Sequence, residues 1–223
     1  MTKRSAIAIE LDEYLESMGP PGLFIQAAAK LFYEKGYVGT TIEEISARAG
    51  FTKGAFYYYF ESKADLLRRI HDLFISKALD DAERIMAGNA SPDQKLCMLI
   101  DSLIKCIDAY LPYVTVFFNE FHHLEEPNRS EITRKRDRYF SIFLQAMTQS
   151  VEEDLYRKDI DPRIAVFGLF GMCNWMHKWY HPGGPWTSSD ISRNFIEIFR
   201  KGMLNRPIAM GFVGQAPEDS NKT

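Results

Sequence analysis

Hydroxyl, ammonium and phenol side chains gather in one short stretch near the N-terminus of the chain. Thr52 and Lys53 stand where a short helix, residues 53–59, is expected to begin. The free N–H groups at a helix N-terminus attract phosphate, and a hydroxyl and an ammonium beside them add to this attraction. The phenols of Tyr57 and Tyr58 can bond phosphates while their rings cover sugars or thymine methyl groups. Together these residue types indicate nucleic-acid binding.

A second short helix, residues 41–49, must hold this segment in place. Thr41 and Glu44 have the spacing of a capping box, which predicts that this helix begins at Thr41. Gly50 permits a left-handed backbone and therefore a sharp turn at the end of this helix. Two short helices joined by a tight glycine-containing turn form a helix-turn-helix, whose second helix enters the major groove of DNA.

The segment from Gly36 to Leu67 closely resembles the DNA-binding domain of the tetracycline-repressor (TetR) family. The matching positions are Gly36-Tyr37, Thr40-Thr41, Glu43-Glu44, Ile45-Ser46, Ala49-Gly50, Lys53-Gly54, Tyr57, Phe60, Lys63 and Leu66. The resemblance implies an all-helical homodimer that leaves double-stranded operator DNA when a ligand binds. It also implies DNA contacts from Thr41, Thr52, Lys53, Gly54, Tyr57, Tyr58 and Lys63.

The charge of this segment departs from what DNA binding would favour. Family members often have an arginine-rich lead into the first helix, whereas here only Lys3 and Arg4 are candidates for an arm that reaches a groove. Residues 20–70 hold seven basic and five acidic side chains, a balance of +2. Shape and placement must therefore matter more than bulk charge. In the alternative interpretation, the two threonines act only as helix caps and the two tyrosines only line the core.

The composition describes a globular protein and not a polycation. The chain has 223 residues, a net charge of −3 and 46% hydrophobic residues. Its three cysteines are widely spaced and form no Cys-x-x-Cys pair, which argues against a disulfide framework or a zinc site. The most apolar stretch, residues 166–175, is about half the ~18 residues of a membrane span, and no export signal is evident. We therefore expect a cytoplasmic protein with no membrane partner.

Helix caps and apolar repeats of period 3.6 predict an all-α fold with almost no strand. The predicted helices are 22–35, 41–49, 53–59, 62–87, 92–110, 112–125, 128–157, 162–180 and 188–204. Residues 20–70 are expected to form a three-helix helix-turn-helix domain, and residues 71–206 a helical bundle for ligand binding and dimerisation. Residues 1–19 and 207–223 are expected to be flexible ends.

The larger predicted domain carries no catalytic motif, so neither an enzyme nor a cofactor is expected. His122 and His123 would diverge by about a hundred degrees on a helix. Glu120 and His123 would share a face, but without partners on other helices, and His177 and His181 lack a third ligand. No metal site is therefore expected. The alternatives are an enzyme with an accessory helix-turn-helix and a DNA-binding architectural protein without a ligand.

Large aromatic and methionine side chains fall on three consecutive predicted helices of this domain. Core packing must account for most of them, yet a bundle so rich in bulky adaptable groups can enclose a cavity for a small apolar effector. The candidate ligand-binding residues are Phe117, Phe121, Phe140, Phe143, Met147, Met172, Trp175 and Trp179.

The stretch from Asn174 to Gly184 narrows the effector class. Its Asn-Trp-x-x-x-Trp-Tyr-x-Pro-x-Gly pattern resembles a branch of the family that represses fatty-acid or sterol breakdown and answers to acyl-CoA thioesters. An acyl-CoA is therefore the leading candidate. The basic run Arg134, Lys135, Arg136 and Arg138 offers partners for CoA phosphates, although a solvated charged face is the simpler interpretation.

The last predicted helix carries an apolar stripe that a monomer would have to hide elsewhere. The stripe consists of Ile191, Phe195, Ile198 and Phe199. Pairing it with the helix at 162–180 across a two-fold axis predicts a homodimer with a four-helix interface.

Overall fold

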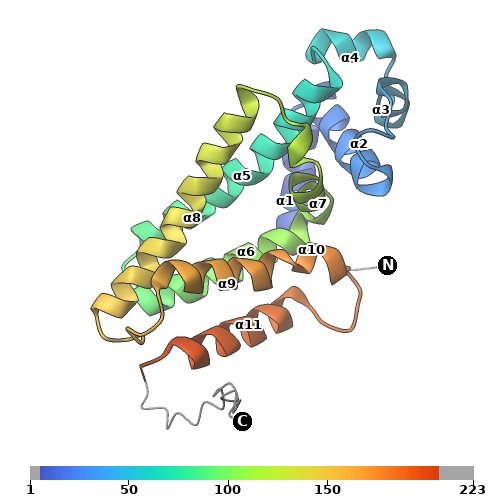
Figure 1. Cartoon of the computed structure of the whole chain (residues 1–223). Helices are drawn as coiled ribbons and strands as arrows, with labels where there is room; N and C mark the ends of the chain where they lie inside the picture. Colours follow the sequence, from blue (N-terminus) through green and yellow to red (C-terminus); the bar gives the residue numbers. More distant parts are fainter. Residues whose placement is uncertain (1–5, 206–223) are drawn as a thin grey trace, which may run out of the picture.

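Eleven α-helices and one 3-10 turn make up residues 6–205, the part of the chain that the computed structural model describes (Figure 1). Their bounds are α1 Ala6–Ser17, α2 Pro20–Lys35, α3 Ile42–Ala49, α4 Lys53–Tyr59, α5 Lys63–Ala87, α6 Pro92–Ala109, α7 Leu111–Asn119, η1 Phe121–His123, α8 Asn128–Glu152, α9 Pro162–Asn174, α10 Met176–Trp179 and α11 Ser188–Met203. The predicted all-α class is confirmed. None of the described helices is both long enough and apolar enough to cross a membrane.

Helices α2, α3 and α4 form a small unit around a cluster of aromatic rings. Phe24 of α2 is fully buried, and its ring centroid lies 5.3 Å from that of Phe51, 5.6 Å from Phe56 and 5.9 Å from Phe60. Such tilted and edge-on pairs stabilise beyond the area they bury. They hold the turn between α3 and α4 against α2, so the two short helices do not depend on their own weak helix propensity.

Helix α5 joins this small unit to a larger helical bundle. Leu66 and Leu67 in its first turns are fully buried, and Phe74, Ile75 and Ala78 further along are buried as well. In Figure 1 the helix runs from α4 into the bundle without a break, and it packs there beside α8. One continuous helix therefore joins the buried residues of both units into a single hydrophobic core.

Helix α11 is fastened to α6 by three acidic side chains of α6, Asp93, Asp101 and Asp108. Their carboxylates accept hydrogen bonds from Arg200, Ser192 and Ser188 of α11, respectively. The spacing of seven or eight residues keeps the three acids on one face of α6. Helices α9 and α11 lie together at one end of the bundle in Figure 1.

The prediction that residues 1–19 form a loose end is wrong for residues 6–17, which form α1. Leu11 and Leu15 are four residues apart and lie buried on one face, where α1 packs against α2 and α6. Asp12 Oδ1 accepts a hydrogen bond of 2.7 Å from Gln26 Nε2 of α2. Glu13 and Glu16 are exposed on the opposite face, so α1 is an amphipathic helix. Lys3, Arg4 and residues 207–223 lie outside the described residues.

Three predicted helices are shorter than expected. The helix predicted at 128–157 ends at Glu152. The predicted helix at 112–125 ends at Asn119 and continues as the 3-10 turn η1. The predicted helix at 162–180 is divided at Trp175, where His177 Nδ1 lies 2.5 Å from the Asn174 carbonyl oxygen. The break at Trp175 turns the side chains of α10 onto a different face from those of α9.

Replacing Gly22 with alanine should destabilise the protein, although alanine is favoured over glycine in a helix by about 1 kcal/mol. A Cβ at position 22 would lie 1.8 Å from the Leu15 carbonyl oxygen, so α1 would have to move away from α2. We expect the free energy of unfolding in urea to fall by about 1–3 kcal/mol. The matched control is Gly54→Ala in α4, where the new Cβ would meet only Thr52 Oγ1, at 3.7 Å. Equal stability of the two variants would contradict the packing of α1 described above.

Candidate nucleic-acid interface and ligand cavity

One face of α4 is open to solvent while the opposite face is buried. Phe56 is fully buried, whereas Tyr57 and Tyr58 are 51% and 82% exposed. The interpretation of these tyrosines as core residues is therefore not supported by the structure. Thr41, Thr52, Lys53 and Gly54 are exposed as well, so six of the seven predicted DNA contacts are accessible to a large ligand.

The N-terminus of α4 has the features of a phosphate-binding site. The hydroxyl of Thr52 accepts a hydrogen bond of 3.2 Å from the Ala55 N–H, and its own proton remains available for a phosphate oxygen. The N–H groups of Lys53 and Gly54 belong to the first turn, which has no partner within the helix. Gly54 keeps this end open, since the nearest atom to a Cβ there would be 3.7 Å away. Thr41 caps α3 in a reciprocal pair with Glu44, as its spacing predicted.

Most cations of the small unit are paired with carboxylates in the free protein. Lys53 Nζ lies 2.5 Å from Glu43 Oε1, and Arg48 Nη1 lies 2.6 Å from Glu34 Oε2. The hydrogen bond from Lys53 lowers the pKa of Glu43. Exposed pairs of this kind contribute little to stability. Lys53 can therefore exchange its carboxylate for a DNA phosphate at small cost.

Lys63 has an internal role that sequence reasoning missed. Its ammonium donates hydrogen bonds of 2.8 Å to the carbonyl oxygens of Tyr37 and Thr40, and it lies 4.3 Å from the centre of the Tyr37 ring. Partial burial lowers the pKa of Lys63. The side chain thus fastens the turn between α2 and α3 to the start of α5. A phosphate contact through its third proton stays a prediction.

Two further arginines lie beside the reading helix. A polar hollow of about 610 Å³ is bordered by Tyr57 and Tyr58 of α4 and by Arg68 and Arg69 of α5. Both arginines pair with Asp65, whose Oδ1 lies 3.1 Å from Arg68 Nη2 and 3.4 Å from Arg69 Nε. They were not predicted as site residues, because their position beside α4 follows from the packing of α5 and not from local spacing.

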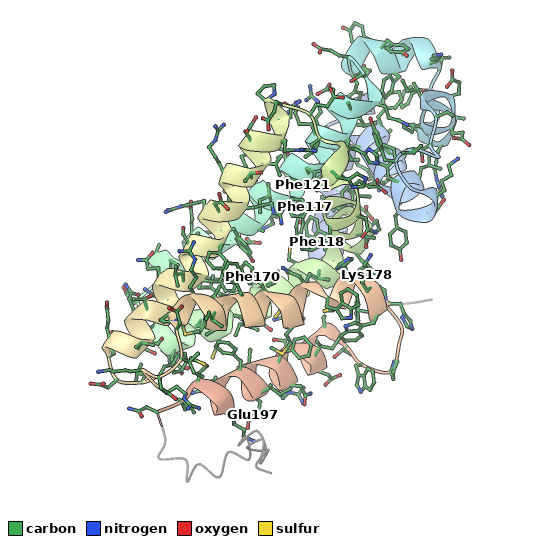
Figure 2. The ribbon with its side chains drawn as sticks, in the orientation of Figure 1. Phe117, Phe118, Phe121, Phe170, Lys178 and Glu197 are labelled. Atoms are coloured by element: carbon green, nitrogen blue, oxygen red, sulfur yellow. The ribbon has the colours of Figure 1, made fainter. Side chains whose placement is uncertain are left out.

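A cavity of about 320 Å³ lies in the bundle between α5, α7, α8 and α9. Its walls are mainly aromatic, and Figure 2 labels Phe117 and Phe118 on α7 and Phe170 on α9. The other lining residues are Phe74, Ile75, Ala78, Leu103, Arg136, Asp137, Tyr139, Phe140, Arg163, Phe167 and Asn174. Its position between the helices named from the sequence agrees with the expected sensor.

Only some of the predicted ligand-binding residues line this cavity. Phe117 and Phe140 do, and Phe121 lies next to it. Phe143 and Met147 are fully buried in the core behind the cavity wall, and Met172 packs against that core. Trp175 and Trp179 do not line the cavity and are 61% and 36% exposed. The residues missed, Phe118, Arg163, Phe167 and Phe170 above all, depend on the rotation of α7 and α9.

Two guanidinium groups border the apolar cavity. Arg136 Cζ lies 4.7 Å from the ring centre of Phe121 and 5.5 Å from that of Phe117, and Arg163 Cζ lies 5.7 Å from that of Phe140. Burial lowers the pKa of Arg136. Among the described residues, no carboxylate lies within 4.0 Å of either guanidinium. The other basic residues of the predicted run point elsewhere: Lys135 pairs with Asp72, Arg138 with Glu83, and Arg134 is exposed.

Family models match both parts of the chain. The model for bacterial regulatory proteins of the tetR family matches residues 24–70, and the model for the tetracyclin repressor-like C-terminal domain matches residues 89–203. The chain belongs to the TetR family. It is a DNA-binding transcriptional regulator and not an enzyme. Helix α1 precedes both matched segments.

Relatives and solved structures agree with this family. The transcriptional repressor KstR2 of Mycobacterium tuberculosis is 25% identical over 189 residues, which cover 84% of this chain and 94% of KstR2. The solved structure of that KstR2, a ketosteroid transcriptional regulator, matches 83% of this chain and 95% of its own with a TM-score of 0.79. AibR, solved with isovaleryl coenzyme A and operator DNA, matches 80% of this chain and 97% of its own at 23% identity, with a TM-score of 0.72.

Replacing Lys53 with alanine should weaken operator binding in a salt-dependent way. If Lys53 exchanges Glu43 for one phosphate, its loss lowers the slope of log affinity against log salt by about one unit. Fluorescence anisotropy on operator DNA over a series of salt concentrations measures both quantities. Lys158→Ala is the control, because Lys158 is also exposed and paired, with Asp154 at 2.7 Å, but belongs to the other unit. A slope that is unchanged in Lys53→Ala would remove Lys53 from the interface.

Proposed function

We propose that this TetR-family protein is a repressor that binds operator DNA as a homodimer and leaves it when an acyl-CoA thioester binds. The observation that carries the effector class is an aromatic cavity bordered by Arg136 and Arg163, neither of which forms an ion pair with a carboxylate of the described residues, although Asp137 also lines the cavity. An apolar body fits the walls, and an anionic group fits the guanidinium groups, which bind phosphates well.

The size of the cavity suggests that only one part of the ligand lies inside it. A volume of about 320 Å³ lies at the lower end of ligand pockets, which span ~300–1,000 Å³. It suits an acyl group and is too small for a whole CoA thioester. The CoA portion would then extend out of the cavity past Arg136 and Arg163, where its phosphates find cations. Asn174, the first residue of the acyl-CoA-type sequence pattern, also lines the cavity.

Helix α5 can transmit a displacement from this cavity to the DNA-binding helices. Phe74, Ile75 and Ala78 of α5 line the cavity, while Leu66 and Leu67 of the same helix are buried in its first turns, just after α4. A ligand that favours a different position of α5 would move the two reading helices away from the spacing of successive major grooves. A ligand that binds both positions equally would not release DNA.

Helices α9 and α11 present the surface that we assign to the homodimer. Ile164 and Phe167 of α9 and Ile198 of α11 are large apolar side chains that are exposed, and α9 packs against α11. A Cβ at Gly168 or Gly171 would meet open space, so a partner helix can approach α9 closely.

Fewer residues of the predicted apolar stripe of α11 are exposed than the dimer prediction assumed. Ile191 and Phe199 are 5% and 9% exposed, because they pack inward within the same chain, and Phe195 is half-buried. Ile198 alone of the four lies fully outward, at 60% exposure. The dimer surface is therefore formed mainly by α9, with α11 contributing Ile198 and the open face of Gly202.

Replacing Ile198 with glutamate should separate the dimer without unfolding the chain. The side chain is exposed in the single chain, whereas in the proposed interface two unpaired charges would be buried. We expect the dimer dissociation constant to rise by at least about 100-fold, as measured by analytical ultracentrifugation. Met98→Glu replaces another exposed apolar residue, on α6, and should leave the dimer intact. A monomeric wild-type protein at micromolar concentration that still binds operator would refute the proposed dimer.

A panel of CoA thioesters should identify the effector by calorimetry and by release of operator DNA. Arg136→Gln and Arg163→Gln should each weaken binding of the active thioester by roughly 10-fold or more, because the guanidinium groups hold the CoA portion. The affinity for the free acid should fall less. Arg138→Gln is the control, since Arg138 pairs with Glu83 and does not line the cavity. Equal losses for thioester and free acid would contradict this arrangement. If no thioester of the panel binds, the acyl-CoA proposal is refuted, while the assignment of the protein as a DNA-binding regulator stands.

A further inference from the structure

Three potential metal ligands converge at the end of α7, outside the cavity. A ligand atom from each of Glu120, His122 and His123 lies within 4.8 Å of the other two. The sequence argument against such a cluster assumed a continuous helix, in which the two histidines diverge. In the structure α7 ends at Asn119 and the 3-10 turn η1 follows, so the two imidazole rings lie with their centres 4.0 Å apart.

The carboxylate of Glu120 lacks a strong cationic partner. Its side chain is 13% exposed, and the basic group within 4.0 Å of it among the described residues is His123, whose Nε2 is 3.5 Å away. Lys63 is close enough to be influenced by the carboxylate, but two protons of its ammonium are bound to the carbonyl oxygens of Tyr37 and Thr40. A mostly buried carboxylate in this setting is stabilised by an additional cation.

We propose that Glu120, His122 and His123 bind one divalent transition-metal ion of the zinc class. Two imidazole nitrogens and one carboxylate oxygen are ligands that Zn²⁺ prefers, and three protein ligands leave a fourth position for water. In a tetrahedral site the ligand atoms lie roughly 3.4 Å apart. His123 Nε2 and Glu120 Oε2 already lie 3.5 Å apart, and all ligand atoms lie within 4.8 Å of one another, so the remaining contraction is at most about 1.4 Å. Rotation of the exposed His122 ring can supply it.

The turn that carries these ligands is held in place by its neighbours. Arg129 donates hydrogen bonds to the carbonyl oxygens of His122 at 2.7 Å and of Leu124 at 2.9 Å. The ring of Tyr37 lies 5.0 Å from that of His123 and limits its orientation. Outer contacts of this kind orient metal ligands and raise affinity. They distinguish this turn from a chance cluster on a mobile loop.

The site lies where the two units of the protein meet. Helix α7 packs against α2, and Tyr37, which contacts His123, belongs to the turn between α2 and α3 that Lys63 fastens to α5. A bound ion would fix His123 against Tyr37 and stiffen this joint. Metal binding and unfolding are then linked, because an ion held by the native state alone raises the stability of that state.

Titration of the full, tag-free chain with Zn²⁺ by calorimetry, and with Co²⁺ by visible absorption, tests this site. We expect one ion per chain, a Co²⁺ spectrum without thiolate charge-transfer bands, and a higher melting temperature in Zn²⁺. His122→Ala and Glu120→Gln should each weaken binding by at least about 10-fold. Both should fold, since His122 is exposed and glutamine has nearly the size of glutamate.

His181→Ala is the matched control, because His181 is an exposed histidine outside the cluster and its loss should leave binding unchanged. Cys97→Ser should also bind normally, which separates this site from binding by the partly buried thiol of Cys97. Absence of Zn²⁺ binding to the wild-type chain would overturn the proposal. So would binding that survives both His122→Ala and Glu120→Gln, or binding that is lost in the His181 or Cys97 variant.

Discussion

The structure depends above all on the continuity of α5, whose 25 residues run from the helix-turn-helix into the larger bundle. Leu66 and Leu67 anchor its beginning beside the helix-turn-helix, and Phe74 and Ile75 anchor its middle in the bundle. Because hydrogen bonds within a helix resist bending, a displacement at one anchor is carried to the other. The position of the reading helix α4 is therefore tied to the shape of the cavity.

Two contacts outside α5 limit how far the small unit can turn. Helix α1 crosses from α2 to α6 and buries Leu15 between them. Lys63 joins the turn before α3 to the first turn of α5 through the carbonyl oxygens of Tyr37 and Thr40. A joint held at several points has few stable arrangements, as a switch between DNA-bound and released forms requires.

Features of the chain that depend on near neighbours in sequence were predicted well, and features that depend on packing were not. The caps at Thr41 and Thr52 and the left-handed turn at Gly50 follow from spacings of a few residues, and the structure has all three. Trp175 was misplaced because it continues α9 on the helix face of Gly168 and Gly171, and the packing of α9 leaves that face open. The inward role of Lys63 could not be predicted, since its carbonyl partners lie more than twenty residues away in sequence.

The most direct test of the coupling through α5 is a distance measured between the two reading helices of the dimer. A spin label on Tyr33→Cys of α2, which is exposed and outside the predicted DNA contacts, reports the position of the unit that carries each reading helix. The chain also carries Cys97→Ser, and Cys106 and Cys173 are buried, so pulsed electron resonance sees this label alone. We predict one narrow distance distribution with operator bound, and a different, equally narrow one with the thioester that releases DNA. An effector that releases DNA while this distance stays unchanged, or becomes broad and featureless, would contradict rigid coupling through α5.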